Sequence, residues 1–247
     1  MNKTICFETF PKRKEIKLFI NSCKDYLFPG YFTRKVRSDK KQLKLIKKLY
    51  SKYICPSTGD YFIKELPRVR EELKKDLDFF FESDPASESK DEIVIAYPGF
   101  LAIMFYRIAH VIYNLKVPYA PRLISEIAHS KTGIDINPGC KIGCPFFIDH
   151  GTGIVIGETS EIGNYVKMYH GVTLGALSLK EGRELEGKKR HPTIKDYVTI
   201  YSGASILGGQ TIIEERAVIG SNVFIVNSVV KDTTVIYSQD LINKFVK

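Results

Sequence analysis

A histidine in a glycine-rich segment is the best candidate for acid–base chemistry in this sequence. His150 lies in the segment 147–153, where glycines stand at positions 151 and 153, and Asp135 precedes it by fifteen residues. A carboxylate can hold a neutral imidazole in one tautomer, which leaves the other ring nitrogen to act as a general base toward a hydroxyl. The residues alone leave a second interpretation open, in which His150 is a hydrogen-bonded histidine at a corner of the chain and has no catalytic role.

A second candidate group is the pair Arg190 and His191, which directly precedes Pro192. The planar guanidinium of an arginine suits a carboxylate ligand. Taken by themselves, however, the two residues are explained as an exposed pair at the end of a loop. His110 and His129 lie in segments with a helical pattern, where we expect structural roles. The sequence contains no GxSxG, P-loop or GxGxxG motif.

The composition predicts a folded, soluble protein of one large or two small domains. The chain has 247 residues, of which 44% are hydrophobic and 26% charged. The longest apolar stretch, 93–105, is too short to span a bilayer, and the N-terminal residues lack the apolar core of a secretory signal. We therefore expect a cytoplasmic protein with no membrane partner. The five cysteines form no CxxC pair, and no second Cys or His pair completes a four-ligand set with Cys140 and Cys144, so we expect no metal.

The net charge of +9 is concentrated in the first 90 residues, which carry 21 Lys and Arg against 13 Asp and Glu. A basic segment such as 40–49 can attract nucleic acid or anionic lipid. Its apolar residues Leu45, Ile46 and Leu49 recur at helical spacing, which favours the solvated face of a helix. We therefore expect no nucleic-acid partner. A nucleic-acid-binding module without enzymatic activity remains an alternative at this point.

The apolar pattern predicts an α-helical domain over residues 1–132. Helices are indicated at 16–27, 42–54, 62–81 and 100–115, with proline and glycine clusters between them. The segment 83–92 lies between the third and fourth of these helices. Its composition, taken alone, is typical of an exposed linker.

After residue 132 the aliphatic residues recur at every sixth position, often followed by glycine, which is not a helical period. A hexapeptide repeat explains both features, since each hexad forms one short flat face and three faces close a coil of about 18 residues. Residues 133–247 are therefore predicted to form a parallel β-helix of roughly five coils. The charged stretch 180–190 cannot line a dry core, and we expect a loop at about 176–191 to leave the stack. The inward residues are predicted to be Ile136, Ile142, Ile148, Ile154, Ile156, Ile162, Met168, Leu174, Ile194, Ile200, Ile206, Ile213, Ile219 and Ile225.

Several ordered blocks resemble the serine O-acetyltransferase family, and the resemblance covers about residues 80–230. It implies an α + β protein: a helical N-terminal assembly domain followed by a left-handed parallel β-helix of hexapeptide repeats. It also implies transfer of the acetyl group of acetyl-CoA to L-serine in cysteine biosynthesis, and a homotrimer, with two trimers joined in many members. The blocks are 84–86, 106–110, 133–138, 149–159, 171–175 and 190–194.

The resemblance assigns roles residue by residue. It makes His150 the general base and Asp135 the carboxylate that orients it, with direct acetyl transfer and no acyl-enzyme. Acetyl-CoA is then a co-substrate, and no metal takes part. Asp84 and Asp149 match positions that receive the amino group of serine, and Arg190 and His191 match those that hold its carboxylate. Cofactor contacts are assigned, on a less specific match, to Gly175, Ser202 and Ser221.

The sequence also departs from the family pattern. Asn137 stands where a histidine is frequent, Ala176 replaces a usual second glycine, and the loop at 176–189 is longer than in the enterobacterial type. The segment 241–247 lacks the terminal isoleucine that family members insert into cysteine synthase. That complex and feedback inhibition by cysteine are therefore left open.

Two further enzymes remain alternatives at this stage. One is a hexapeptide acyltransferase acting on a sugar or an antibiotic, which has no need of residues 84–86 or of the pair Arg190 and His191 to recognise an amino acid. The other is a zinc hydratase of carbonic anhydrase type, for which His150, His170 and His191 are the available ligands. Asp149 and Arg190 beside these histidines suit an amino acid better than a zinc ion.

Overall fold

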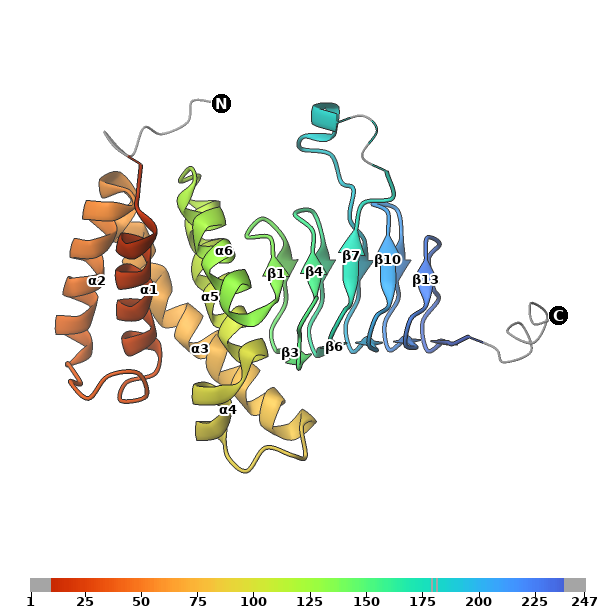
Figure 1. The fold of residues 1–247 in the computed structure, drawn as a ribbon, viewed down its shortest axis with the longest axis horizontal. Coiled ribbons are helices and arrows are strands. Elements are labelled where there is room, and N and C mark those ends of the chain that lie inside the picture. The colour runs from red at the N-terminus through yellow and green to blue at the C-terminus, as the bar shows by residue number, and fades with distance from the viewer. Residues whose placement is uncertain (1–9, 179, 181, 238–247) are drawn as a thin grey trace. The chain divides into compact units, whose positions relative to one another are not determined.

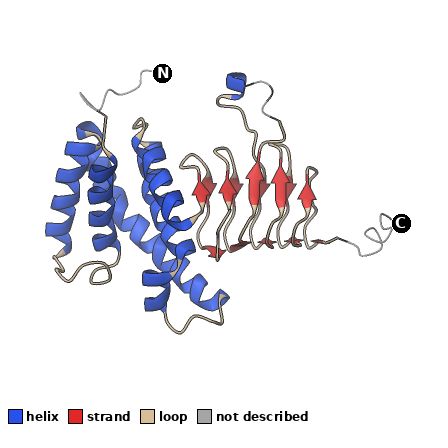
Figure 2. Cartoon of the chain, in the orientation of Figure 1, coloured by secondary structure: helices blue, strands red, loops and turns tan. Residues whose placement is uncertain are grey.

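The computed structural model describes residues 10–178, 180 and 182–237 of the chain. These residues divide into two compact units between Gly139 and Cys140, a helical unit and a unit of short parallel strands (Figures 1 and 2). The C-terminal segment 241–247, on which the missing terminal isoleucine falls, lies outside the described residues.

The first unit contains the four predicted helices and two further α-helices. The described elements are α1 (Arg13–Leu27), α2 (Asp39–Tyr53), η1 (Pro56–Thr58), α3 (Gly59–Ser83), α4 (Lys90–Ala96), α5 (Pro98–Asn114), α6 (Ala120–Thr132) and β1 (Asp135–Ile136). The short helix α4 begins where the hydroxyl of Ser89 accepts a hydrogen bond from the N–H of Glu92, and ends two residues before Pro98. Helix α6 ends at Gly133, whose φ of +71° is the left-handed conformation that glycine adopts readily.

Aromatic side chains join the helices of the first unit. The rings of Phe19 on α1 and Tyr50 on α2 lie 5.4 and 4.6 Å from the ring of Phe62 on α3, and all three residues are buried. Further along α3, Phe80 contacts Phe100 of α5 edge to face at 5.5 Å. Buried aromatic pairs of this kind add specific geometry to the burial of apolar area. They join α1, α2 and α5 to α3.

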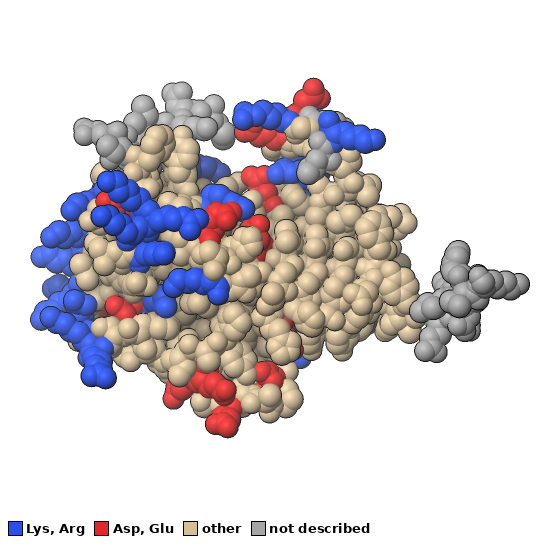
Figure 3. All heavy atoms as spheres, in the orientation of Figure 1, with Lys and Arg blue, Asp and Glu red and all other residues tan. Residues whose placement is uncertain are grey.

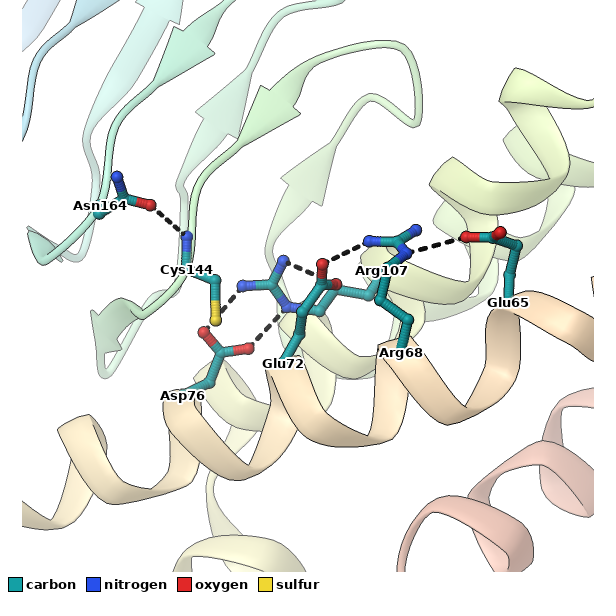
Figure 4. Close-up of polar contacts among 7 residues, drawn as sticks. All are labelled: Glu65, Arg68, Glu72, Asp76, Arg107, Cys144 and Asn164. Carbon is teal, nitrogen blue, oxygen red and sulfur yellow. Dashed lines mark hydrogen bonds and ion pairs between the residues drawn. The ribbon is translucent and has the colours of Figure 1, made fainter.

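A buried ion pair crosses from α5 to α3 within this core (Figure 4). The guanidinium of Arg107 donates to both carboxylate oxygens of Asp76, at 2.6 Å from Nε and 2.8 Å from Nη2. Their side chains are 4% and 0% exposed. Each of these buried charges is stabilised by the opposite charge of its partner. Removing either one destabilises the fold, because the remaining charge then lies in a medium of low polarity without a counter-charge.

We expect the substitution Arg107→Met to destabilise the protein by about 3–5 kcal/mol, because it removes the guanidinium that offsets the buried negative charge of Asp76. The double variant Asp76→Leu, Arg107→Met removes both charges and is expected to recover a large part of this loss. Urea unfolding followed by circular dichroism measures both effects. A single variant as stable as the parent would show that the pair does not hold α5 on α3.

The second unit is a parallel β-solenoid whose strands form three faces. Its strands are β2 (Lys141–Ile142), β3 (Phe146–Asp149), β4 (Val155–Ile156), β5 (Glu161–Ile162), β6 (Val166–Tyr169), β7 (Thr173–Gly175), β8 (Thr193–Ile194), β9 (Thr199–Ile200), β10 (Ser205–Leu207), β11 (Ile212–Ile213), β12 (Val218–Ile219), β13 (Phe224–Ile225) and β14 (Thr234–Val235). The successive pairs are β4–β7–β10–β13 on one face, β2–β5–β8–β11 on the second and β3–β6–β9–β12–β14 on the third. The predicted hexapeptide architecture is confirmed.

The strand register stacks the predicted inward residues directly on one another. Within the solenoid these residues are buried except Ile142, which is partly exposed. Each coil therefore buries its aliphatic side chains on those of the next, and no single coil buries them alone. The three columns are Ile156, Leu174, Ile206 and Ile225; Ile142, Ile162, Ile194 and Ile213; and Ile148, Met168, Ile200 and Ile219.

The charged stretch after β7 leaves the stack, as the sequence predicts. Its described residues include a 3₁₀ turn, η2 (Gly182–Leu185), which stands out beyond β7 in Figure 1. The chain returns to the stack at β8, which pairs with β5. The pairing of the coils therefore continues across the loop.

The surface of the first unit is strongly basic, with lysine and arginine gathered over the helices (Figure 3). Helix α2 has six lysines in fifteen residues, and its inward side chains include Ile46 and Leu49. The amphipathic helix predicted for this segment is thus confirmed. Among the described residues no single helix is long and apolar enough to cross a membrane; α4 and α5 taken together, bent by 72° at their junction, pass on length and composition.

Candidate active site

One edge of the solenoid carries a row of polar residues at equivalent positions of successive coils. His150 and His170 follow β3 and β6, and Ser202 and Ser221 lie two residues after β9 and β12. The two imidazole rings are 5.9 Å apart, and the two serine hydroxyl oxygens lie 3.2 Å from each other. The structure therefore brings three of the predicted site residues, His150, Ser202 and Ser221, into one row.

The row exists because the chain turns the same corner between two faces in successive coils. The residue after each polar residue has a positive φ: +87° at Gly151, +72° at Gly171, +72° at Gly203 and +58° at Asn222. Glycine adopts this conformation without strain. The backbone N–H of Gly203 donates to the carbonyl of His170 at 2.9 Å, which fixes the spacing between neighbouring coils.

His150 is presented to solvent rather than to the aliphatic core. Its side chain is 73% exposed, and its Nδ1 lies 3.6 Å from Oδ1 of Asp149, beyond hydrogen-bond distance. Its own φ is +54°, but Tyr165, Tyr197 and Arg216 share this conformation at other turns. The positive φ of His150 is thus explained by the turn. Its exposed ring lies outside the core and is suited to contact a ligand.

Asp135 is held by an arginine of its own unit. Nη1 and Nη2 of Arg122, on α6, lie 3.3 and 3.4 Å from the two carboxylate oxygens of Asp135 on β1. Because Asp135 belongs to the helical unit and His150 to the solenoid, their predicted pairing stays a prediction.

Asp84 sits in a built turn at the end of α3. Its Oδ1 accepts the N–H of Ala86 at 2.9 Å, and its Oδ2 accepts the hydroxyl of Tyr97 at 2.6 Å. Ser83 still belongs to α3, and α4 already begins at Lys90. The interpretation of 83–92 as an exposed linker is therefore wrong at both ends, because composition alone does not register the Ser89 cap or these contacts of Asp84.

Arg190 and His191 are anchored together at the end of the extruded loop. The hydroxyl of Thr159 accepts hydrogen bonds from both backbone N–H groups, at 2.9 Å from Arg190 and 3.0 Å from His191. Nη2 of Arg190 forms an ion pair with Glu158, and Nη1 lies 3.4 Å from the carbonyl oxygens of Leu185 and Lys188. The interpretation of these residues as an exposed pair at the end of a loop is wrong, because Arg190 is half-buried and His191 is buried.

The imidazole of His191 is buried, with the residue 8% exposed, and held in one protonation state. Its Nδ1 faces the N–H of Thr159 at 3.1 Å and the hydroxyl at 2.9 Å. Because Nδ1 accepts the backbone N–H, the ring proton must lie on Nε2. Burial, and next the charge of Arg190, lower the pKa of His191 from 6.5 to about 4, so the ring is neutral at neutral pH.

The ring of His191 lies against the backbone of Gly157. A Cβ at position 157 would stand 2.0 Å from Cδ2 and 2.1 Å from Nε2 of His191, which no side chain tolerates. Glycine at this position therefore makes room for the ring. A neutral N–H donor beside a guanidinium is an arrangement that receives a carboxylate.

Gly175 ends β7, and its carbonyl accepts the N–H of Gly208 at 3.0 Å. A Cβ there would lie 2.7 Å from Cδ2 of Leu207. Gly175 thus packs closely against the next coil, and its assignment to the cofactor rests on the resemblance.

Within the described residues one group has the spacing of metal ligands: Glu126, His129 and Asp135. The guanidinium of Arg122 already forms ion pairs with both of its carboxylates. A cation in that place would meet an arginine, so the group does not suit a metal.

The sequence analysis gave no role to Thr159, Glu158, Gly157 or Tyr97. All four contact a predicted site residue. The glycine after Ile156 was visible only as part of the repeat. No local signal marks Thr159, because its contacts are 31 and 32 residues away.

We expect His191 to remain neutral at pH 6 and to titrate near pH 4, since its folded pKa is depressed. The stability that this group contributes is present above pH 6.5 and is lost as the pH falls from 6.5 to about 4. ¹⁵N chemical shifts of the imidazole nitrogens measure this, with His191→Gln identifying the resonance. Titration between pH 6 and 7 would contradict the buried, neutral ring.

No protein-family model matches the chain. Among curated proteins, it is 46% identical over 164 residues to a serine acetyltransferase of Bacillus subtilis, a match covering 66% of this chain and 72% of that protein. It is 47% identical over 171 residues to a plasmid-encoded serine acetyltransferase of Synechococcus elongatus. That match covers 68% of this chain and spans about half, 53%, of the relative's length.

Solved structures agree with these matches. Serine acetyltransferase 1 of Entamoeba histolytica in complex with L-cysteine has a TM-score of 0.80 at 36% identity, with 96% of this chain and 90% of that chain covered. Serine acetyltransferase of Neisseria gonorrhoeae with serine has a TM-score of 0.68 at 26% identity, covering 91% and 82%. A serine acetyltransferase complex with CoA has a TM-score of 0.64 at 26% identity, covering 89% and 80%. From the architecture and from a curated relative matched over more than two thirds of its length, the chain belongs to the serine acetyltransferase family.

Proposed function

We propose that the protein transfers the acetyl group of acetyl-CoA to the hydroxyl of L-serine, which yields O-acetyl-L-serine and CoA and leads from serine toward cysteine. Family membership supports the reaction, and the relatives solved with serine and with CoA support the two substrates. The observation that carries the proposal is the anchored pair Arg190 and His191. It brings together a guanidinium, held in place by Glu158, and a neutral N–H donor, and both groups suit the carboxylate of an amino acid.

A single residue that acts first as general base and then as general acid is enough for this acetyl transfer. The imidazole of His150 takes the hydroxyl proton of serine while the oxygen attacks the thioester carbonyl carbon. A tetrahedral intermediate then collapses as its carbon–sulfur bond breaks, and the imidazolium returns the proton to the departing thiolate sulfur. The exposed ring of His150 supports this role. Asp135 orienting the ring, Asp84 and Asp149 receiving the amino group, and Gly175, Ser202 and Ser221 contacting the cofactor are parts of the same proposal, supported by the resemblance.

The homotrimer implied by the family is also proposed here. The solenoid leaves Tyr165, Tyr197 and Tyr201 exposed by 41%, 51% and 40%, and the rings of Tyr165 and Tyr197 stack at 4.8 Å. Exposed aromatic residues are enriched at protein interfaces. Sedimentation equilibrium distinguishes a monomer, a trimer and a pair of trimers.

The substrate test is an acceptor comparison. We expect thiol release from acetyl-CoA with L-serine, and little release with other amino acids, sugars or aminoglycoside antibiotics, because Arg190 and His191 suit a carboxylate. The release is followed with a thiol reagent at saturating acetyl-CoA. Preference for a sugar or an antibiotic would establish the alternative acyltransferase, and no turnover with L-serine would refute the proposal.

The substitution His150→Ala is expected to lower kcat roughly 10²- to 10⁴-fold, the usual contribution of a general base. The fold should be unaffected, because the ring lies outside the aliphatic core. His129→Ala, which removes an exposed histidine on α6, is the matched control and should leave kcat near that of the parent. Turnover by His150→Ala at the parent rate would remove this residue from the mechanism.

A further inference from the structure

We propose that Thr159 is a positioning residue for substrate recognition: its hydroxyl holds the backbone of Arg190 and His191 and orients the imidazole that receives the serine carboxylate. The inference rests on the proposed function. All the contacts that carry it lie within the solenoid unit, so the packing of the two units does not enter.

The hydroxyl of Thr159 is used to its full hydrogen-bonding capacity. A threonine hydroxyl has one donor and two acceptor positions. Both acceptor positions are taken by the backbone N–H groups of Arg190 and His191, at 2.9 and 3.0 Å. The single hydroxyl hydrogen is then left for Nδ1 of His191, 2.9 Å away. One side chain thereby fixes two consecutive residues of a loop end and the ring of one of them.

The ring orientation determines what His191 can offer a ligand. With Nδ1 occupied by the N–H and hydroxyl of Thr159, the proton lies on Nε2, and Nε2 is a hydrogen-bond donor. With the proton on Nδ1 instead, Nε2 would present a lone pair to the substrate carboxylate and repel it. Thr159 therefore selects the donor face of the imidazole, and the ring rests on Gly157 in that position.

Burial is the main reason that the pKa of His191 is lowered, and the charges around the ring come second. Arg190 and Lys189 disfavour an imidazolium, and Glu158 opposes them. Lys189 also ties the loop end to Thr159, because its Nζ donates to the carbonyl of Thr159 at 2.7 Å. The carbonyl of Thr159 thus accepts a hydrogen bond from Lys189, and its backbone N–H donates to Nδ1 of His191. Its hydroxyl accepts from the two N–H groups of Arg190 and His191 and also contacts Nδ1 of His191.

The substitution Thr159→Val tests the hydroxyl, because valine keeps the branched shape and loses the hydrogen bonds. We expect KM for L-serine to rise roughly ten- to a hundredfold, with KM for acetyl-CoA unchanged and kcat reduced much less. Thr159→Ser restores the hydroxyl and is expected to restore KM for serine. Thr234→Val, an exposed threonine on β14, is the control and should behave as the parent.

A second readout does not depend on turnover. In ¹⁵N-labelled parent protein, we expect imidazole shifts of an Nε2–H tautomer for His191, and in Thr159→Val a pKa closer to 6.5. A merely structural threonine would lower thermal stability without changing the pKa of His191 or the ratio of the two KM values. An Nδ1–H tautomer in the parent overturns the proposal, and this measurement stands even where Thr159→Val does not fold.

The outcomes separate this inference from the function on which it rests. Parent protein that does not acetylate serine refutes the proposed function. Active parent protein with an unchanged KM for serine in Thr159→Val refutes the role of Thr159 alone. Loss of serine affinity that Thr159→Ser does not rescue also counts against it.

Discussion

The stacking of aliphatic residues in register is the interaction on which the rest of this structure depends. A coil of three short faces has no interior of its own, and its inward residues leave water only when the next coil covers them. The register of Ile148, Met168, Ile200 and Ile219 on one face shows how strictly this is met. Because the coils cannot slide past one another, residues at the same phase of successive coils are brought to the same edge. The row of His150, His170, Ser202 and Ser221 follows from that constraint.

Arg190 and His191, at the end of the extruded loop, are held to the stack by side-chain contacts rather than by strand pairing. Glu158 and Thr159 lie in the turn after β4, whereas Arg190 and His191 come about thirty residues later. The coil geometry brings these segments together, and one hydroxyl and one ion pair fix them. The neutral state of His191 has the same origin, since burial and a neighbouring guanidinium both penalise a second positive charge.

The periodic parts of the fold could be predicted from the sequence, because repetition leaves a signal that does not depend on distant contacts. The sixfold spacing identified the inward residues of the solenoid, of which Ile142 is the least buried. Helices α4 and α6 were missed, since α4 is only seven residues long and its start depends on a single capping serine. Residue roles came from the resemblance. The role of Thr159 could not be predicted from the sequence, because its partners Arg190 and His191 lie about thirty residues further along the chain, beyond the extruded loop.

The extruded loop has a consequence for how such a protein can diversify. From Val155 to Glu161 the chain passes between two faces in six residues, whereas from Thr173 to Thr193 it takes twenty, yet Val155 pairs with Thr173 and Glu161 with Thr193. The strand pairing is therefore the same for a connection of six residues and for one of twenty. Insertions, deletions and charge changes at 176–188, before the anchored residues 189–191, can therefore accumulate without disturbing the register of the stack.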